Sequence, residues 1–484
     1  MKIAFVTSEA FPFAKTGGLA DVSNALPRAL ARQGHDVRLF MPRYYVVDRK
    51  KYSLTRIGSP LGVPFGPGER WGAIEKSSYL DGITTYFIEH EEYFGRDGLY
   101  DDGRHAYHDN AERFIFFCRA VLQAVKALDF IPDIIHCNDW QTGLIPLFLK
   151  THYAADPFYA ATGTLMTIHN VGYQGVFHRD VFPLTRLGWE HFNGKGLEFF
   201  GQLNFLKAGI IYADAVSTVS KKYTLEIQSP EFGYELAPVF KSISKRLYGI
   251  INGVDYSKWK PATDPFISAG YSIEDTSGKR VNKTSLQETM LLPPDGEMPV
   301  IGCISRLTYQ KGMDLLVQSL EWLLQNETFQ FVILGSGEQW IIDRFQYLKS
   351  LFPDRLGLFW GYNEELSHLV EAGSDMFVMP SRYEPCGLNQ MYSMAYGTIP
   401  IVHATGGLDD TVEDWDETTK SGNGFKYREN TIDQLYTTVR KALRVYRHPG
   451  SWRTLQKNAM EFHNSWDDAV IEYEKLYKTI QRKR

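Results

Sequence analysis

Near its N-terminus the chain reads Lys15-Thr16-Gly17-Gly18-Leu19-Ala20-Asp21-Val22. The apolar run at residues 3–6 predicts a buried strand before this stretch. The apolar spacing over residues 22–30 predicts a helix after it, which ends at Gly34. A second apolar run, residues 37–41, predicts the next strand. Strand, helix and strand at this spacing indicate a βαβ unit within a parallel sheet.

The turn between this first strand and helix suits an anion such as phosphate. In a parallel open sheet it lies at the carboxyl ends of the strands, where ligands bind. Gly17 and Gly18 would let backbone N–H groups approach an anion, and Lys15 and the helix N-terminus would add positive charge. The same residues also suit a glycine-rich turn beside a solvated lysine, and this stretch alone leaves both interpretations open.

Two familiar phosphate-binding motifs do not fit the chain. The turn is not G-x-G-x-x-G, and no G-x-x-x-x-G-K-[ST] occurs in the sequence. Gly335-Ser336-Gly337 begins a similar glycine turn, but Trp340 occupies the position of the third glycine. The sequence therefore disfavours a dinucleotide-dependent dehydrogenase and a P-loop nucleotidase, without excluding either.

Composition indicates a globular enzyme of two domains. The chain has 484 residues, of which 44% are apolar and 23% charged. The net charge of −5 gives no reason to expect nucleic acid or an acidic membrane as a partner, so an anion site must be a local basic pocket. The four cysteines lack C-x-x-C spacing, which suits a reducing compartment. With no apolar run near the ~20 residues that span a bilayer and no room for a signal peptide, we expect a cytoplasmic protein without a membrane partner.

Two alternations of strands and helices predict two doubly wound domains. Residues 44–110 are expected to be irregular apart from a strand at 84–88, with a surface loop at 93–110. Residues 252–298 are rich in Gly, Pro, Asp, Lys and Ser and are expected to form a linker region. The other expected strands are residues 133–137, 165–168, 216–220, 300–304, 330–334, 358–360, 376–379 and 399–402. The predicted domains are residues 1–250 and 251–464, followed by a basic amphipathic helix at 465–484.

Polar residues follow several of these strands. Arg306 and Lys311 flank a loop that ends at a helix N-terminus, where they could bind a diphosphate or remain separate surface charges. Glu384 precedes a helix and could cap it, or could reach a ligand hydroxyl or a developing cation. Thr405-Gly406-Gly407 forms a second Gly-Gly turn before a helix, and His169 follows another strand. Two facing domains would bring such loops to one cleft, which suits a large ligand with a diphosphate.

Six motifs resemble those of bacterial glycogen synthases and plant starch synthases. They are Lys15-Thr16-Gly17-Gly18-Leu19, residues 167–170, residues 251–255, Ser305-Arg306 with Lys311-Gly312, residues 380–388 and residues 405–408. They occur in that family's order and span nearly the whole chain. The Lys-Thr-Gly-Gly-Leu and Glu-Pro-Cys-Gly-Leu blocks are specific, whereas the second half alone would indicate only a retaining glycosyltransferase of the GT-B type.

The resemblance implies an α/β fold of GT-B architecture, with two doubly wound, Rossmann-like domains that face a deep cleft. It implies transfer of glucose from ADP-glucose to the non-reducing end of an α-1,4-glucan such as glycogen, with retention and without a cofactor. It implies an acceptor side in the N-terminal domain, a nucleotide-sugar side in the C-terminal domain, and a last helix that crosses back to the N-terminal domain. The implied catalytic residues are Glu384, Arg306, Lys311, His169 and Asp139. The implied substrate-binding residues are Lys15, Gly17, Gly18, Asp21, Asn252, Tyr362, Cys386, Gly387, Leu388, Thr405, Gly406 and Gly407.

Within this set the resemblance implies distinct roles. Lys15, Arg306 and Lys311 would bind the diphosphate, and the two Gly-Gly turns would add backbone donors. Glu384 would lie beside the donor glucose, with contacts from the rest of its loop, whereas His169 and Asp139 would line the sugar and acceptor side. The resemblance also implies that Tyr362 packs near the adenine and that Asn252 falls at the domain junction.

Three points stay open at the level of sequence. The nearest alternative function is that of a UDP-glucose-dependent synthase of the same fold. Two further alternatives are a pyridoxal-phosphate-dependent phosphorylase and a non-catalytic glucan-binding protein. The D-x-D at Asp414-Trp415-Asp416 lies in an acidic run that suits a solvated face, so we expect no metal requirement. Asn138 occupies a position where the family often has histidine.

Overall fold

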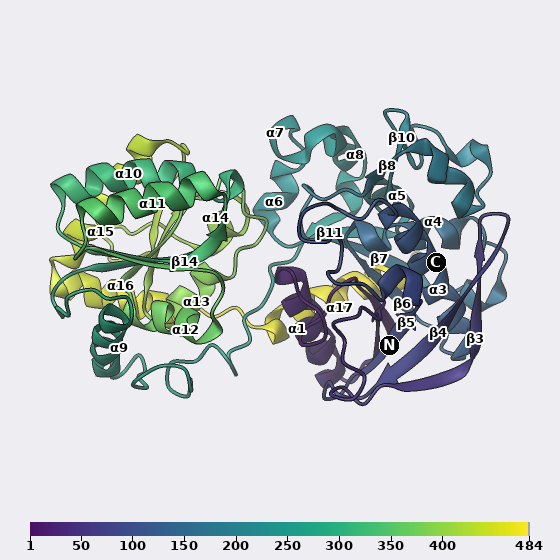
Figure 1. The fold of residues 1–484 in the computed structure, drawn as a ribbon, viewed down its shortest axis with the longest axis horizontal. Coiled ribbons are helices and arrows are strands. Elements are labelled where there is room, and N and C mark those ends of the chain that lie inside the picture. The colour runs from purple at the N-terminus through teal and green to yellow at the C-terminus, as the bar shows by residue number, and fades with distance from the viewer. Residues whose placement is uncertain (483–484) are drawn as a thin grey trace. The chain divides into compact units, whose positions relative to one another are not determined.

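The computed structural model describes residues 1–482, which divide into two units (Figure 1). Unit 1 contains residues 1–219, residues 224–251 and the C-terminal segment from Trp466. Unit 2 contains residues 220–223 and 252–465. The boundaries expected after residues 250 and 464 each lie one residue from those of the units. The assignment of residues 220–223 to unit 2 was not expected.

Unit 1 is built on a nine-stranded sheet of order β12-β11-β7-β6-β1-β2-β5-β4-β3 in the described part of the chain. The strands are β1 (Lys2–Val6), β2 (Asp36–Pro42), β3 (Thr55–Phe65), β4 (Gly68–Ser77), β5 (Thr84–Glu89), β6 (Ile134–Asn138), β7 (Gly163–Ile168), β11 (Ala215–Thr218) and β12 (Leu247–Gly249). Neighbours from β12 to β5 run parallel, and β3 and β4 form an antiparallel hairpin at one edge. β1 is buried along most of its length, as expected for a parallel strand covered on both faces.

The hairpin corrects the expectation that most of residues 44–110 are irregular. Two prolines and two glycines interrupt the alternating pattern of β3, so its sequence does not read as a strand. β4 nevertheless pairs with β5 and buries residues 72–75. The expected surface loop at 93–110 is also only partly correct, because Tyr93, Phe94 and Leu99 are buried.

The helices of unit 1 include the predicted C-terminal one. They are α1 (Gly18–Arg32), α2 (Glu91–Phe94), α3 (Asn110–Ala127), α4 (Leu144–Lys150), α5 (Phe205–Tyr212), α7 (Pro230–Gly233), α8 (Ala237–Ser242) and α17 (Trp466–Arg482). A further helix, α6 (Lys221–Glu226), begins in unit 2 and ends in unit 1. A small separate sheet of unit 1 consists of β8 (Val176–Phe177), β9 (Glu198–Phe199) and β10 (Gln202–Asn204). α17 packs against α1 and β7, and Tyr477 Oη lies 2.8 Å from His136 Nδ1. The last two positions of the predicted helix, 483 and 484, lie outside the described residues.

Unit 2 contains a parallel sheet of order β15-β14-β13-β16-β17-β18. The strands are β13 (Val300–Leu307), β14 (Gln330–Gly337), β15 (Leu356–Trp360), β16 (Met376–Met379), β17 (Ile399–His403) and β18 (Phe425–Tyr427). The helices are α9 (Ser277–Thr289), α10 (Met313–Asn326), α11 (Gln339–Leu351), α12 (Glu364–Gly373), α13 (Asn389–Ala395), α14 (Gly406–Thr411), α15 (Ile432–Tyr446) and α16 (Pro449–Glu461). Figure 1 shows α10 and α11 on one face of this sheet and α12 and α13 on the other. The predicted α/β class with parallel sheets in two domains is therefore confirmed.

Residues 252–298 are not a linker. α9 lies in this segment and packs against α12, with Leu286 and Val370 in one apolar cluster. The Lys279 Nζ donates hydrogen bonds to Tyr396 O (3.0 Å) and Thr398 Oγ1 (2.6 Å). The sequence of α9 was too polar to be recognised as a buried helix. Its lysine and asparagine side chains nevertheless lie inside the unit, where they have hydrogen-bond partners. No helix formed by residues 1–482 is both long and apolar enough to cross a membrane.

In each sheet, the next strands of the chain are added on one side of the first strand and later strands on its other side, so the strand order reverses beside the first strand. In unit 2 the order corresponds to 3-2-1-4-5-6, and the reversal lies between β13 and β16. In unit 1 it lies between β1 and β6. Open α/β sheets bind ligands beyond the carboxyl ends of the strands at this topological switch point. The loops after these four strands are therefore where a site is expected in each unit.

Candidate active site

In unit 2 the switch point brings together a lysine and a glutamate from different loops. Lys311 follows β13 and Glu384 follows β16, and Lys311 Nζ lies 2.5 Å from Glu384 Oε2. Ser381 Oγ donates a second hydrogen bond to the same carboxylate oxygen, at 3.0 Å. Glu384 is buried, so this carboxylate depends on those donors to compensate for lost hydration. The sequence suggested both residues but did not suggest that they pair.

Arg382 connects the two loops that carry this pair. Its guanidinium makes two hydrogen bonds to the Asp314 carboxylate, at 2.6 and 2.7 Å, and stacks 3.5 Å from the centre of the Tyr309 ring. Its backbone N–H also donates to Gln310 O (2.9 Å). Arg382 lies within the motif at residues 380–388, but the sequence does not indicate its role. Its position two residues before Glu384 was the available signal.

The helix-cap interpretation of Glu384 is wrong. α13 begins at Asn389 with Leu388 at its N-cap, and no side chain caps it. The Glu384 carboxylate points instead to Lys311 and Ser381. Burial raises the pKa of the Cys386 thiol to about 12, so this cysteine is an unreactive packing residue of the same loop.

The second Gly-Gly turn also differs from expectation. The Gly407 N–H donates to Glu384 O (3.1 Å) and Pro385 O (3.2 Å), so it is not available to a ligand as predicted. A Cβ at Gly406, where φ is +45°, would lie 2.0 Å from Glu384 O, and one at Gly407 would lie 1.9 Å from Cys386 O. The turn needs glycines because it packs directly on the backbone of the Glu384 loop. Thr405 is the N-cap of α14 and is buried.

The other predicted residues of unit 2 come from several segments of the chain. The Arg306 Nη2 donates to Gln310 Oε1 (3.2 Å), in the loop of Lys311. Asn252 is buried where the chain enters unit 2, and its backbone oxygen accepts from Asn464 Nδ2 (2.9 Å). Gly387 has φ +68° and Tyr362 is exposed just after β15.

In unit 1 the Lys15 turn is anchored by Glu9, a residue that sequence reasoning missed. The Glu9 carboxylate accepts from Thr16 N (2.6 Å), Gly17 N (3.2 Å), Thr16 Oγ1 (2.6 Å) and Tyr100 Oη (2.8 Å). A carboxylate of the chain therefore occupies the place beside Gly17 N–H that the sequence assigned to a ligand anion. A buried glutamate six residues before the turn is not distinctive in sequence, and Tyr100 comes from the expected surface loop.

The glycines of this first turn have no structural requirement within the chain. Gly17 has φ −152°, an extended conformation open to any residue, and Gly18 is the first residue of α1. A Cβ at either position would meet no atom of the described chain within 4 Å. Lys15 Nζ lies 2.8 Å from Asp21 Oδ1 at the surface of the unit. This turn therefore has space for an external group beside a cation.

Asp139 and His169 lie after the adjacent strands β6 and β7. The His169 N–H donates to Asp139 Oδ1 (2.8 Å), and His169 Nε2 lies 2.9 Å from Asn138 Oδ1. Burial raises the pKa of Asp139 to about 7, although backbone N–H groups of His169 and Asn170 oppose the shift. Burial lowers the pKa of His169 to about 4, so its ring is neutral at pH 7. The negative charge of Glu9 also raises the pKa of Asp139, which places these two carboxyls in one electrostatic environment.

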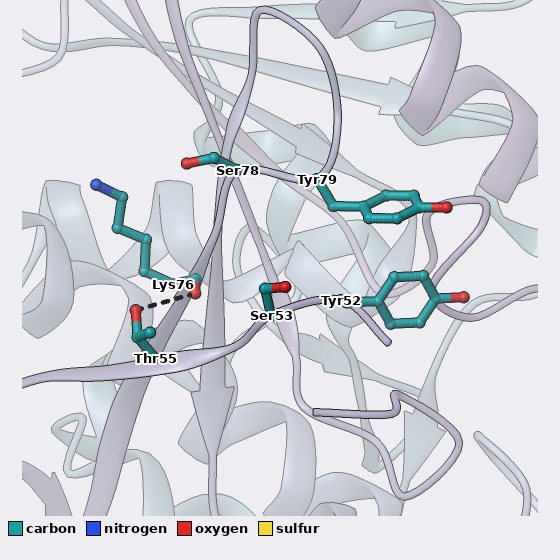
Figure 2. Close-up of a pocket in the computed structure, with 6 residues that line it drawn as sticks. All are labelled: Tyr52, Ser53, Thr55, Lys76, Ser78 and Tyr79. Carbon is teal, nitrogen blue, oxygen red and sulfur yellow. Dashed lines mark hydrogen bonds between the residues drawn. The ribbon is translucent and has the colours of Figure 1, made fainter. Parts of the chain in front are cut away.

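A separate hollow of about 370 Å³ lies on unit 1 (Figure 2). It is lined by Tyr52, Ser53, Thr55, Lys76, Ser78 and Tyr79, none of which the sequence suggested as a site residue. Figure 2 shows the Tyr52 and Tyr79 rings side by side at one end of it. Tyr52 Oη donates to Pro12 O (2.7 Å), which connects this hollow to the segment before Lys15.

Family comparisons cover most of the chain. The model described as starch synthase catalytic domain matches residues 2–242, and the model described as glycosyl transferases group 1 matches residues 292–459. The chain is 45% identical to glycogen synthase 1 of Geobacter metallireducens, over 100% of the chain and 97% of that protein. It is 46% identical to the glycogen synthase of Koribacter versatilis, over 100% and 99%.

Two solved structures are also similar. The catalytic domain of starch synthase IV from Arabidopsis thaliana, bound to ADP and acarbose, matches with a TM-score of 0.91 and 32% identity over 99% of each chain. Sucrose-phosphate synthase from Thermosynechococcus elongatus matches with a TM-score of 0.61 and 19% identity over 100% of each chain. The second similarity concerns the fold alone.

Proposed function

This chain belongs to the glycogen and starch synthase family of glycosyltransferases, and from that membership we propose that it transfers glucose from ADP-glucose to the non-reducing end of an α-1,4-glucan, with retention. The ADP in the similar starch synthase IV structure supports the choice of nucleotide. The observation that carries the proposal is the Lys311–Glu384 pair at the switch point of unit 2. In this pair the Lys311 cation is suited to binding a diphosphate, and the Glu384 carboxylate is suited to binding a sugar.

We assign the donor chemistry to unit 2. Lys311 and Arg306 neutralise the charge that grows on the departing diphosphate, as fixed cations do for a developing anion. Glu384 accepts hydrogen bonds from the donor glucose and favours positive charge at its anomeric carbon. Arg382 keeps the two loops in register through Asp314 and the Gln310 backbone. The Lys311–Glu384 and Arg382–Asp314 ion pairs hold these side chains in place, so little reorganisation is needed at the moment of reaction.

The proposed reaction takes place on one face of the sugar. The bond from the anomeric carbon to the ADP phosphate breaks, the acceptor oxygen forms a new bond on the same side, and the acceptor proton moves to the leaving phosphate. A double displacement would need a second carboxylate as nucleophile, about 5 Å from the first in retaining hydrolases. Two other carboxylates, Asp314 in α10 and Asp409 in α14, form ion pairs with Arg382 and Lys426 respectively. We therefore propose the single-face route, with Glu384 as the one carboxylate beside the donor glucose.

We assign the remaining roles to unit 1 and to the edges of unit 2. Lys15 adds a cation for the donor diphosphate, and the space beside Gly17 and Gly18 accommodates an external group. Asp139 and His169 bind sugar hydroxyls on the acceptor side. The remaining predicted residues, Asp21, Asn252, Tyr362, Cys386, Gly387, Leu388, Thr405 and Gly406, stay proposed as substrate-binding or supporting residues. A cytoplasmic location, which suits four buried thiols, is also proposed.

Product formation with glycogen as primer tests the donor and the reaction together. We expect chain elongation from ADP-glucose, much slower elongation from UDP-glucose, and release of ADP equal to glucose incorporated. Lys311→Ala should abolish most of this activity, and EDTA should leave it unchanged. Elongation from UDP-glucose alone would establish the rival donor. Glucan binding without release of either nucleotide would contradict the proposal.

A further inference from the structure

Asn138 is the last residue of β6 and contacts two neighbouring strands. Its side-chain Nδ2 donates to Val6 O (3.0 Å) on β1, and its Oδ1 lies 2.9 Å from the His169 Nε2 that follows β7. Asn138 is completely buried, so each of these polar atoms needs its partner. The Asn138 backbone oxygen accepts from Thr142 Oγ1 (2.9 Å), which fixes the residue from a third direction.

These contacts determine the direction of each hydrogen bond between Val6, Asn138 and His169. A backbone oxygen can only accept, so the amide nitrogen of Asn138 must face Val6 and the amide oxygen must face His169. That amide oxygen can only accept in turn, so His169 Nε2 must carry the hydrogen. In the neutral imidazole the other nitrogen, Nδ1, then has a lone pair and no hydrogen.

We propose that Asn138 is a positioning residue that fixes His169 in its Nε2–H tautomer, so that Nδ1 meets a sugar hydroxyl as a hydrogen-bond acceptor. The inference rests on the proposed function, because it assigns the sugar contact to His169. The lowered pKa of His169 is consistent with it, since a neutral ring is required for an accepting nitrogen.

The rigid setting of the ring supports the inference. The His169 backbone N–H donates to Asp139 Oδ1, so two consecutive residues at the end of β6 hold both the main chain and the ring of His169. A tautomer set by a buried amide is independent of the substrate and present before it binds. The acceptor nitrogen is therefore available without a proton shift during the reaction.

The tautomer can be measured directly by ¹⁵N NMR of the whole chain labelled at histidine, because protonated and bare ring nitrogens differ widely in shift. The His169 signal is assigned by its loss in His169→Gln. We expect the hydrogen on Nε2 in the wild type. His136, whose ring nitrogens contact Tyr477 Oη (2.8 Å) and Thr167 Oγ1 (2.6 Å), serves as an internal reference.

Asn138→Leu keeps the shape and removes the acceptor. We expect the hydrogen of His169 to move to Nδ1 and kcat/KM for short glucan acceptors to fall about tenfold, because the sugar hydroxyl must then accept from Nδ1 instead of donating to it and has to reorient. The matched control is Asn282→Leu, another completely buried asparagine, whose amide bonds both polar groups of the Ala269 backbone in unit 2. The control should lose comparable thermal stability while the His169 shifts and kcat/KM stay unchanged.

Three results would overturn the inference. These are a hydrogen on Nδ1 in the wild type, an unchanged tautomer in Asn138→Leu, or a changed tautomer with unchanged acceptor kinetics. The wild-type spectrum decides the first even if the leucine variant fails to fold. Failure of the proposed function would be recognised separately, as absence of glucose transfer by the wild-type protein whatever its tautomer.

Discussion

The Gly17 N–H of unit 1 donates to the side-chain carboxylate of Glu9, whereas the Gly407 N–H of unit 2 donates to backbone oxygens of residues 384 and 385. Both Gly-Gly pairs lie where a helix begins after a strand, with Gly18 the first residue of α1 and Gly406 the first residue of α14. A Cβ would meet the backbone at 1.9 Å in the second turn and no described atom within 4 Å in the first. The second pair of glycines is thus explained by packing, whereas packing within the described chain gives no reason for the first pair.

Lys15 of unit 1 and Lys311 of unit 2 also differ, in the solvent exposure of the ion pairs that they form. The Lys15 and Asp21 side chains are 38% and 37% exposed, and those of Lys311 and Glu384 are 18% and 9% exposed. An exposed pair contributes little to stability and exchanges partners readily, whereas a buried pair is strongly destabilised when one member is removed. Lys15 and Lys311 both lie near a switch point, but mutation of each is therefore expected to have different consequences. The following changes test that difference, beginning with the largest expected effect.

Glu384→Gln should lower kcat about a hundredfold or more, because it removes the charge proposed to stabilise the transition state. The ADP dissociation constant should change little, since the glutamine oxygen still accepts from Lys311. Steady-state kinetics and calorimetry measure the two quantities. The matched control is Glu327→Gln, a similarly buried carboxylate paired with Arg440 and Arg447, which should keep full kcat. Near-normal kcat in folded Glu384→Gln would remove Glu384 from the mechanism.

Glu9→Ala should lower kcat/KM for ADP-glucose by about tenfold to a hundredfold, because the turn loses all four hydrogen bonds to this carboxylate. Glu9→Gln should lose only a few-fold. Its oxygen can accept from the Thr16 and Gly17 N–H groups, and the Thr16 and Tyr100 hydroxyls can accept from its amide. In a Lys15→Ala background both effects should shrink. Equal activity of Glu9→Ala and wild type would show that the turn does not depend on Glu9.

The two turns are compared directly by Gly17→Ala and Gly407→Ala. Gly407→Ala should destabilise the fold by about 1–3 kcal/mol, because the new methyl overlaps the Cys386 backbone. Gly17→Ala should melt at the wild-type temperature and bind ADP about tenfold more weakly, because the methyl fills space assigned to the ligand. Melting curves and ADP titrations measure these effects. ADP binding by Gly17→Ala as tight as that of the wild type would show that the space beside Gly17 is not part of the ADP site.

Asp139 should make unit 1 sensitive to pH. Burial raises its folded pKa to about 7, so the folded chain retains this proton more strongly than the unfolded chain. The stability it contributes is complete below about pH 4 and is lost as pH rises to about 7. Asp139→Asn should therefore gain stability relative to wild type across this range. Urea denaturation of both proteins at several pH values measures the difference, and a constant difference would contradict the shifted pKa.

Asp21→Asn should have the smallest effect on folding. Its ion pair with Lys15 is exposed, and such pairs contribute about 0–1 kcal/mol. Lys15→Ala should alter stability equally little, yet weaken the donor contact and the transition state together. Urea denaturation and kcat/KM for ADP-glucose separate the two properties. Wild-type kcat/KM in Lys15→Ala would identify Lys15 as an ordinary surface lysine.

The order of elements was readable from the sequence because periodicity and turn chemistry are local. The strand, turn and helix around Lys15, and five of the six described strands of unit 2, were predicted from short windows. The β3–β4 hairpin and α9 were missed, since glycine, proline and buried lysines disguise their patterns. The motif set spans both halves of the chain, so the family resemblance was also readable from residue order alone.

By itself, the sequence determined which residue types follow the strands and in what order the motifs occur. Only the tertiary structure decided their partners. Lys311 and Glu384 are 73 positions apart, and Asn138 and His169 are 31 apart. Glu9 is close to its turn in sequence, but its fourth donor, Tyr100, lies 91 positions away. The Lys311–Glu384 and Asn138–His169 contacts form because parallel strands end at one edge of a sheet, and strand order in a sheet depends on long-range packing that no local pattern encodes.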